Sequence, residues 1–321
     1  MNSPDRIREE PVRVAIVGAG NRGLGTHLSA IKRAPDLLRL VAAVDTPSEK
    51  PRVRRKVGDE LAFDSSDTAA WVRTARPELA IVATPHDQHL SDMRELAALG
   101  VPVLVEKPPT MNLEEFKSIT KEYETRVPLA VLVANRYTER HRPLRELLAS
   151  PAPGSFIEIA MDVTFAAGRN GWRTARRHAG GGVLLDLGYH FLDLILHTLG
   201  HPTSAEVRLV EYADVLSEVE HEAFVTLRFA EIAAEIGLNL RARPGITRRF
   251  EIRVDGQSLD LVNEEPTTSA IATVAQVRGL LADGFLTGGG AWRDELRGHG
   301  DVMELVESLY GRATREKTTW N

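Results

Sequence analysis

Short runs of apolar residues alternate with amphipathic stretches over the first 135 residues of the chain. The run from Val12 to Val17 is rich in β-branched residues and is followed by glycines, which is typical of a buried parallel strand. Similar runs predict strands at 40–44, 79–83, 103–105 and 129–134, and the stretches between them predict helices at 26–34, 67–76, 88–99 and 113–124. This alternation predicts an α/β fold, a doubly wound parallel sheet covered by helices on both faces.

Beyond residue 135 the strand-like runs become longer and helices become fewer. Strands are predicted at 156–165, 205–212, 223–229, 233–240 and 250–254, and helices at 139–148, 182–199 and 295–310. Asp255-Gly256 is typical of a tight hairpin, which favours antiparallel pairing. The sequence therefore predicts a first domain over residues 1–135 and a second over 136–321, the latter an α+β domain with a mainly antiparallel open sheet.

Composition agrees with two globular domains and excludes several classes of protein. The 321 residues are 43% hydrophobic and 26% charged, with a net charge of −5, so there is no electrostatic case for nucleic acid or an anionic membrane. The chain has no cysteine, which excludes disulfides and thiolate chemistry. The first ten residues are polar, and no apolar run approaches the ~18 residues of a membrane span. We expect a cytoplasmic, water-soluble protein.

The segment Gly18-Ala19-Gly20-Asn21-Arg22-Gly23 matches the pattern G-x-G-x-x-G between a predicted strand and a predicted helix. In that context Gly18 allows a tight turn, Gly20 lets the backbone approach a pyrophosphate, and Gly23 lets the helix pack on the strand. The phosphates would lie at the helix N-terminus, where free N–H groups favour anions. The first domain is therefore predicted to be a Rossmann domain that binds a dinucleotide.

Asp45 ends the second predicted strand, 22 residues after Gly23. An acid about 20 residues beyond the glycines binds the ribose 2′-hydroxyl, so Asp45 favours NAD over NADP. The alternative is a simple turn residue at a strand end. A cationic cluster just downstream (Arg52, Arg54, Arg55 and Lys56) makes NADP possible if its loop folds back, but a solvated helix face is the favoured explanation.

Two further segments carry candidate chemistry. Lys107 follows Glu106 at the end of a predicted strand, where open α/β sheets bind ligands, and two prolines stiffen its turn; taken alone it is also compatible with an ordinary surface lysine. Asp186 and His190 lie one helical turn apart in an apolar helix, which suits a carboxylate that orients a proton-transferring imidazole or, alternatively, a hydrogen-bonded core pair.

Asp193 and His197 repeat the same spacing on the apolar helix. The four residues together span about three turns at ~1.5 Å per residue, too far for one ion, so we expect no metal site. Asp193 and His197 are instead expected to serve packing or an interface.

In this order the motifs resemble the glucose-fructose oxidoreductase/inositol dehydrogenase/rhizopine catabolism (Gfo/Idh/MocA) family. The resemblance rests on G-x-G-x-x-G, Asp45, the segment 84–89 (TPHDQH), Glu106-Lys107-Pro108, and Gly-Gly-Gly followed by Asp186-x-x-x-His190. It implies a Rossmann domain followed by an α/β domain whose open sheet often forms an oligomer interface, here a dimer or tetramer. The twin-arginine export signal of the periplasmic glucose-fructose enzyme is absent, and Gly25 is an extra glycine.

The resemblance also implies roles for particular residues. Lys107, Asp186 and His190 match the family's catalytic proton-transfer group. The residues expected to contact the cofactor are Gly18, Gly20, Asn21, Arg22, Gly23, Asp45, Thr84, Pro85, His89, Glu106, Lys107 and Asn135. The residues expected to contact substrate are Lys107, Tyr137, Trp172, Arg173, His178, Asp186 and His190.

The resulting hypothesis is an NAD(P)-dependent oxidoreductase that transfers hydride between a nicotinamide cofactor and a secondary alcohol or ketone of a sugar, cyclitol or related polyol. The alternatives are a biosynthetic keto- or imine reductase, an NAD-dependent glycoside hydrolase with transient oxidation, or a non-catalytic dinucleotide-binding regulator. Arginines 169, 173, 176 and 177 hint at an acidic or phosphorylated substrate.

Overall fold

The computed structural model describes residues 10–150, 152, 154–165, 171–213, 217–242, 248–258 and 268–319. The chain divides into two compact units. Unit 1 comprises Met1–Thr110, Glu114–Thr138 and Glu264–Arg297, and unit 2 comprises Met111–Leu113, Glu139–Asn263 and Gly298–Asn321.

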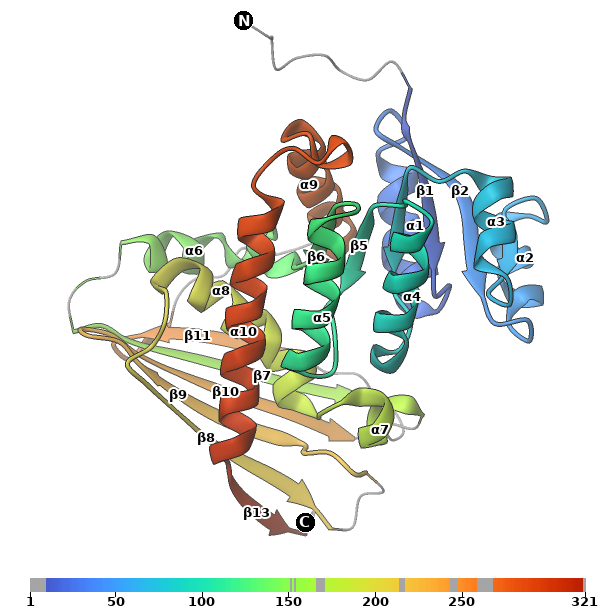
Figure 1. Ribbon diagram of the computed structural model, residues 1–321. Helices are drawn as coiled ribbons and strands as arrows, with labels where there is room; N and C mark the ends of the chain where they lie inside the picture. Colours follow the sequence, from blue (N-terminus) through green and yellow to red (C-terminus); the bar gives the residue numbers. More distant parts are fainter. Residues whose placement is uncertain are drawn as a thin grey trace, which may run out of the picture. The chain divides into compact units, whose positions relative to one another are not determined.

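Unit 1 contains a six-stranded parallel sheet with the order β3-β2-β1-β4-β5-β6 (Figure 1). Its strands are β1 (Val12–Val17), β2 (Leu38–Asp45), β3 (Ala62–Asp64), β4 (Leu79–Val82), β5 (Val103–Glu106) and β6 (Leu129–Leu132). Every residue of β4, β5 and β6 is buried, as expected of strands covered on both faces. The order is that of a Rossmann fold, so the predicted α/β class is confirmed.

The helices of unit 1 include the four that the sequence predicts, together with the unpredicted segments α2, η2, α9 and η6. They are η1 (Asn21–His27), α1 (Leu28–Arg33), α2 (Lys50–Val57), α3 (Thr68–Ala75), α4 (His86–Ala98), α5 (Leu113–Glu124), η2 (Ala134–Arg136), α9 (Thr268–Ala282) and η6 (Phe285–Thr287). The predicted bounds of α5 agree with those observed, whereas α2, β3 and α9 were not predicted. The helix α2 holds only one buried residue, Val53, so its sequence lacks a strong apolar stripe.

The helix α9 lies far along the chain yet belongs to unit 1. Gln276 explains why: its amide nitrogen donates to the carbonyl of Val131 at 2.7 Å, and its amide oxygen accepts from the backbone nitrogen of Val133 at 3.1 Å. The side chain, 1% exposed, thus satisfies backbone groups at the edge strand β6. The second domain expected at 136–321 is therefore interrupted, because residues 264–297 cluster with the first unit.

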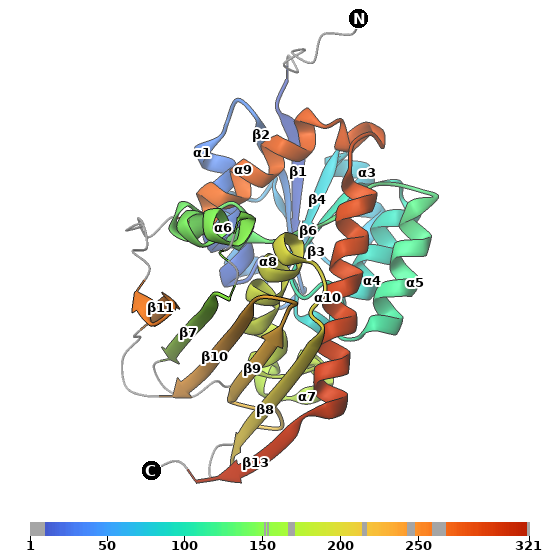
Figure 2. The ribbon, with the colours of Figure 1, turned by 90° about the vertical axis from the view of Figure 1, so that its left-hand side faces the viewer.

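Unit 2 is built on a seven-stranded mixed sheet with the order β12-β11-β7-β10-β9-β8-β13 (Figure 2). Its strands are β7 (Phe156–Phe165), β8 (Ser204–Tyr212), β9 (Glu222–Arg228), β10 (Ala233–Ala242), β11 (Arg248–Val254), β12 (Gln257–Ser258) and β13 (Thr314–Thr318). Four of its pairings are antiparallel, and β7/β10 and β8/β13 are parallel. Positive φ angles at Asp255 (51°) and Gly256 (78°) confirm the tight hairpin.

The helical segments of unit 2 are η3 (Glu139–His141), α6 (Arg142–Ala149), η4 (Trp172–Thr174), α7 (Arg176–Ala179), η5 (Leu184–Gly188), α8 (Tyr189–Leu199) and most of α10 (Trp292–Arg312). Among the described residues, one stretch, Arg176–Leu199, is long and apolar enough to cross a membrane. Its most apolar window is 83% buried inside the protein, as in the core helix of a folded domain.

Candidate active site

The glycine-rich turn after β1 has the geometry that a dinucleotide site requires. Gly18 has φ 87°, and a side chain there would collide with the backbone of Ala83 and Thr84, 2.5–2.7 Å from a Cβ. A Cβ at Gly23 would collide with the carbonyl oxygen of Gly18. Both positions therefore require glycine for the packing of the chain itself.

Gly20 differs, because a Cβ built there has no atom of the described residues within 4 Å, apart from its two neighbours in the chain. Its φ of −74° is open to any residue, so the backbone does not require glycine. A close approach by a bound pyrophosphate does require it, and the first turn of η1 offers backbone N–H groups next to it. The turn therefore fits a dinucleotide.

A buried carboxylate ties the start of η1 to the end of β5. One oxygen of Glu106 lies 2.9 Å from Nε of Arg22 and 2.9 Å from Nε2 of His27. Burial disfavours the ionised form, but the Arg22 charge, the His27 contact and the neighbouring Lys107 charge outweigh it and lower the pKa of Glu106. Glu106 and Arg22 thus support the glycine turn, while Asn21 is exposed beside it.

Asp45 stands at the end of β2, as predicted, but it is not alone. The guanidinium of Arg52 reaches back to it, with Nη2 3.2 Å from its carboxylate and 2.8 Å from the carbonyl oxygen of Ala19. Burial raises the pKa of Asp45 although the Thr46 N–H and the Arg52 charge oppose it. A cation therefore accompanies the acid at the strand end beside the glycine turn.

Lys107 is buried at 7% exposure, directly after β5. The surface-lysine interpretation is therefore wrong, because lysine is rarely buried without a specific role. The turn that carries it is fixed by His89, whose ring nitrogens lie 2.9 Å from the carbonyl oxygens of Pro108 and Thr84. Burial lowers the pKa of His89. At 0% exposure His89 connects the two turns inside the protein.

Thr84 and Pro85 lie between β4 and α4, at the carboxyl end of β4 and therefore on the same side of the sheet as Lys107. The Thr84 hydroxyl donates to the carboxylate of Asp92 at 2.6 Å, and burial raises the pKa of Asp92 to about 6. Asn135 lies in η2 after β6, and Tyr137 follows that turn. A small pocket of unit 1 opens beside this region and is lined by Arg22, Thr26, Glu106, Leu132, Ala134, Ser269, Thr273 and Gln276.

In unit 2, Asp186 and His190 lie on one continuous helical run made of η5 and α8. Asp186 is buried at 8% exposure and His190 is half-buried. The segment that carries Asp186 is π-helical, as is η1 in the glycine turn. π-Helical turns occur frequently at functional sites, and these two are at the two candidate sites of the described chain.

Arg173 lies 3.6 Å from the carboxylate of Asp186 and stacks over the ring of Trp172 at 4.2 Å. The structure therefore brings Trp172, Arg173 and Asp186 together within unit 2. His178 is held by Arg177, whose Nε donates to its Nε2 at 3.0 Å.

The arginines of this region have partners inside the protein. Arg176 donates to the Glu218 carbonyl oxygen at 2.8 Å, Arg177 contacts His178 and Arg173 contacts Asp186, while Arg169 lies outside the described residues. The expectation of an acidic substrate from these arginines is therefore not supported by the three that the structure describes.

Asp193 is fully buried and lies 3.1 Å from Nδ1 of His299, which also lies 3.1 Å from the Tyr189 hydroxyl. The expectation that Asp193 serves packing is confirmed, since it connects α8 to α10. His197 lies near the end of α8 and is exposed.

Sequence reasoning missed three supporting residues: Gln276, Glu220 and Tyr310. Gln276 lies more than 140 residues from its partners, and Tyr310 lies 90 residues from Glu220, so no local pattern marks these contacts. The sequence left open that Arg52 reaches back, and in the structure its guanidinium lies 3.2 Å from Asp45.

Fold and site together define a dinucleotide-binding oxidoreductase. Residues 12–133 match the model of the oxidoreductase family with an NAD-binding Rossmann fold (GFO_IDH_MocA), and residues 141–260 match the GFO/IDH/MocA C-terminal domain. The chain belongs to this family, and it is an NAD(P)-dependent enzyme.

Three similar proteins illustrate the match. A protein named as a UDP-kanosamine synthase oxidoreductase subunit, from Amycolatopsis mediterranei (strain S699), is 31% identical over 78% of this chain and 67% of its own length. The D-glucoside 3-dehydrogenase of Escherichia coli (strain K12) is 29% identical over 63% of this chain and 58% of its own. The crystal structure of GenD2 from gentamicin A biosynthesis, in complex with NAD, has a TM-score of 0.76 at 21% identity, covering 97% of this chain and 96% of that one.

Proposed function

We propose that the protein oxidises a secondary alcohol of a sugar, cyclitol or related polyol, reversibly, with NAD as the cofactor. The names of its relatives support this class of substrate: a D-glucoside 3-dehydrogenase, an inositol 2-dehydrogenase and a 1,5-anhydro-D-fructose reductase. The matched regions of these relatives cover only 43–58% of their own length, so the activity is an inference from similarity together with the site.

The observation that carries the proposal is the burial of Lys107 at the end of β5. In this sheet the ends of β1, β2, β4 and β5 form the side that carries the glycine turn and Asp45. Ligands of open α/β sheets bind at the carboxyl ends of the strands. An ammonium group held there can donate to the oxygen of a substrate next to the cofactor.

The roles follow from the chemistry of each group. When bound, the nicotinamide takes up or returns a hydride. His190 accepts the proton of the substrate hydroxyl, and Asp186 orients the imidazole. Lys107 stabilises the negative charge that develops on the same oxygen. Tyr137 of unit 1 and Trp172, Arg173 and His178 of unit 2 are the further residues that we expect to contact the substrate.

Replacing Lys107 with Ala tests the assignment. We expect turnover to fall about 100-fold or more, since a donor to a developing oxyanion contributes about 10²–10³ in kcat. Binding of NADH, followed by nicotinamide fluorescence, should stay within a factor of about two because the glycine turn is unchanged. Near-normal turnover on the sugar and polyol panel that the wild type oxidises would overturn the assignment.

One observation favours a second candidate, a reductase that uses NADPH. Arg52 lies at the strand end where a 2′-phosphate would be bound, 3.2 Å from Asp45. Preference for NADPH in a fluorescence titration would move the function toward biosynthetic reduction of a keto sugar.

We also propose a homo-oligomer, a dimer or tetramer, that forms through the seven-stranded sheet of unit 2. Phe224 on β9 is 38% exposed, with the Arg208 guanidinium 4.1 Å over its ring. Light scattering of the wild type and of Phe224→Glu would test this, since a monomeric wild type would contradict it.

A further inference from the structure

We propose that Glu220 is a positioning residue that sets the start of the helix carrying Asp186 and His190, and that Tyr310 holds Glu220 in place. This proposal rests on the proposed function of Asp186 and His190. We call the contacts of Glu220 with residues 182–184 and with Tyr310 the Glu220 clamp.

Glu220 supplies the acceptors for three consecutive backbone N–H groups at the helix start. Its Oε1 accepts from Gly182 at 3.0 Å and from Leu184 at 3.1 Å, and its own carbonyl oxygen accepts from Val183 at 3.2 Å. The first N–H groups of a helix have no partner within the helix, and here one residue satisfies three N–H groups at and just before the helix start. Asp186 follows Leu184 by two residues, and its N–H bonds the Gly182 carbonyl at 2.9 Å.

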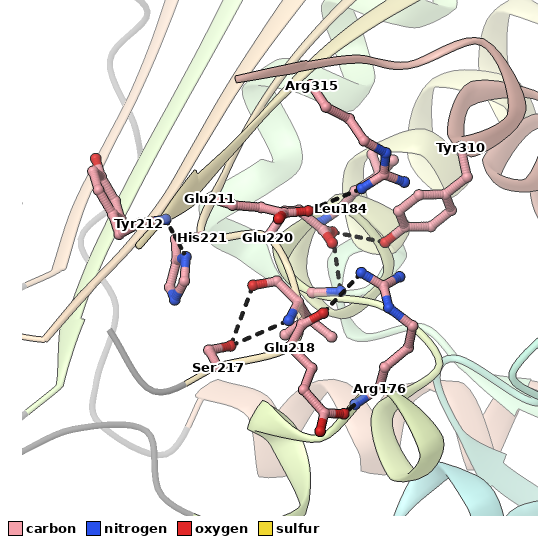
Figure 3. A network of polar contacts seen from close by, with 12 residues as sticks. Arg176, Leu184, Glu211, Tyr212, Ser217, Glu218, Glu220, His221, Tyr310 and Arg315 are labelled. Carbon is pink, nitrogen blue, oxygen red and sulfur yellow. Dashed lines mark hydrogen bonds and ion pairs between the residues drawn. The ribbon is translucent and has the colours of Figure 1, made fainter. Parts of the chain in front are cut away.

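Tyr310 completes the clamp from the other side. Its hydroxyl donates to the same Oε1 of Glu220 at 2.7 Å, so a residue near the end of α10 fixes the carboxylate (Figure 3). Glu220 is 1% exposed, and its Oε2 has no hydrogen-bond partner in the part of the chain that the structure describes. Burial raises the pKa of Glu220.

Two of the three glycines before the helix are explained by this clamp, and the third by its backbone conformation. A Cβ at Gly182 would collide with the carbonyl oxygen of Glu220, and a Cβ at Gly181 would collide with the Tyr310 hydroxyl. Gly180 has φ 76°, which a side chain disfavours. Gly182 thus lets Glu220 come close enough to accept from the backbone, and Gly181 leaves room for the Tyr310 hydroxyl that bonds Glu220.

Glu218, two residues before Glu220 in the same loop, holds the segment that follows Arg173. Glu218 accepts from the backbone N–H of Arg176 at 2.9 Å through its carboxylate (Figure 3). Its own N–H donates to the Thr174 carbonyl at 2.8 Å. The loop 217–221 is therefore bonded both to the segment after Arg173 and to the start of the Asp186 helix. Displacing Glu220 should shift Asp186 relative to Arg173.

The test compares Tyr310→Phe with Tyr123→Phe, each of which removes one buried hydroxyl. Tyr123 donates to the Met93 carbonyl at 2.7 Å in unit 1, away from the proposed chemistry. We expect Tyr310→Phe to lower kcat about 5- to 10-fold and to shift the apparent pKa of kcat/KM, and Glu220→Ala to lower kcat about 100-fold, because misplacement by about 1 Å can cost that much. Glu220→Gln keeps the accepting oxygen and should retain at least about a third of kcat.

Two further readouts separate positioning from general damage. NADH binding should be unchanged in all four variants, since the cofactor turn lies in unit 1. Hydrogen exchange at residues 182–184 should be faster in Tyr310→Phe and unchanged in Tyr123→Phe. Equal kcat and pH profiles in the two tyrosine variants, or unchanged exchange at 182–184, would overturn the proposal. Near-normal turnover of Lys107→Ala would instead overturn the proposed function. The hydrogen-exchange test of the Glu220 clamp would still be valid.

Discussion

The glycine-rich turn after β1 and the glycine-rich turn before η5 both precede a helix, and their local chemistry is similar while their use differs. In the first, after β1, a Cβ built on Gly20 would meet none of the residues that the structure describes within 4 Å, apart from its two chain neighbours. In the second, before η5, a Cβ on Gly182 would collide with Glu220, whose carboxylate accepts hydrogen bonds from the backbone N–H groups of Gly182 and Leu184. A helix start attracts an anion in both places. The first leaves room for an anionic ligand, and the second is filled by the protein's own carboxylate.

Two matched glycine substitutions give the largest contrast between the turns. Gly20→Ala should keep the melting temperature within about 2 °C, yet weaken NADH binding about tenfold or more, because the methyl group enters only ligand space. Gly182→Ala should leave NADH binding intact but destabilise the protein by about 2–4 kcal/mol, because it displaces Glu220. Thermal unfolding and fluorescence titration measure both, and a Gly20→Ala protein that binds NADH normally would contradict the comparison.

The two buried carboxylates next to these turns should respond to pH with opposite signs. The pKa of Glu106 is lowered from its ordinary 4.5, so its contribution to stability is present above that pH and is lost as the pH falls. The pKa of Glu220 is raised from 4.5, so its contribution is fully present below that pH and declines as the pH rises through the folded value.

Melting curves of Glu106→Gln and Glu220→Gln between pH 4 and 8 check this. Relative to the wild type, Glu106→Gln should lose stability most at neutral pH, with the deficit shrinking in acid. Glu220→Gln should match the wild type in acid and gain on it as the pH rises. If the stability difference from the wild type changed with pH in the same direction for both variants, Glu106 would not be stabilised by its ion pairs or Glu220 would not be destabilised by ionisation.

Removing Arg52 should have the smallest effect and should sharpen the picture of the first turn. Arg52→Ala removes a cation from Asp45, so NADPH binding should weaken by about 3- to 10-fold while NADH binding changes by less than about twofold. Arg55→Ala serves as a control, because Arg55 is exposed on the same helix. If Arg52→Ala changed NADH binding and NADPH binding equally, Arg52 would have no part in the choice between the two cofactors.

Sequence patterns predicted most elements because their causes are local. Five of the six strands of unit 1, all except β3, are short apolar runs, and α5 has a clear apolar period, so these elements could be found from the sequence. The helix α9 was missed because its apolar residues form no marked stripe, and its attachment through Gln276 to β6 spans more than 140 residues. The edge strand β13 was missed because its five residues, TREKT, are almost entirely polar.

The candidate site divides in the same way. Local motifs were sufficient to single out Gly18, Gly20, Gly23, Asp45, Lys107, Asp186 and His190, because backbone geometry and chemistry restrict the residue type at each. The residues that hold these candidate site residues in place could not be recognised from the sequence. Glu220 and Tyr310 are an ordinary glutamate and tyrosine until folding brings them, 38 and 128 residues beyond Gly182, to its backbone.

The sequence by itself determined the fold class and the cofactor turn, because each depends on residue type at close spacing. It also predicted the candidate catalytic groups, through their resemblance to the motifs of the family. The tertiary structure alone decided that Lys107 is buried, that Arg52 accompanies Asp45, and that the second glycine turn holds a carboxylate of the protein. These facts depend on contacts between distant segments. Only packing determines whether the space next to a free N–H group is left to a ligand or filled by a side chain.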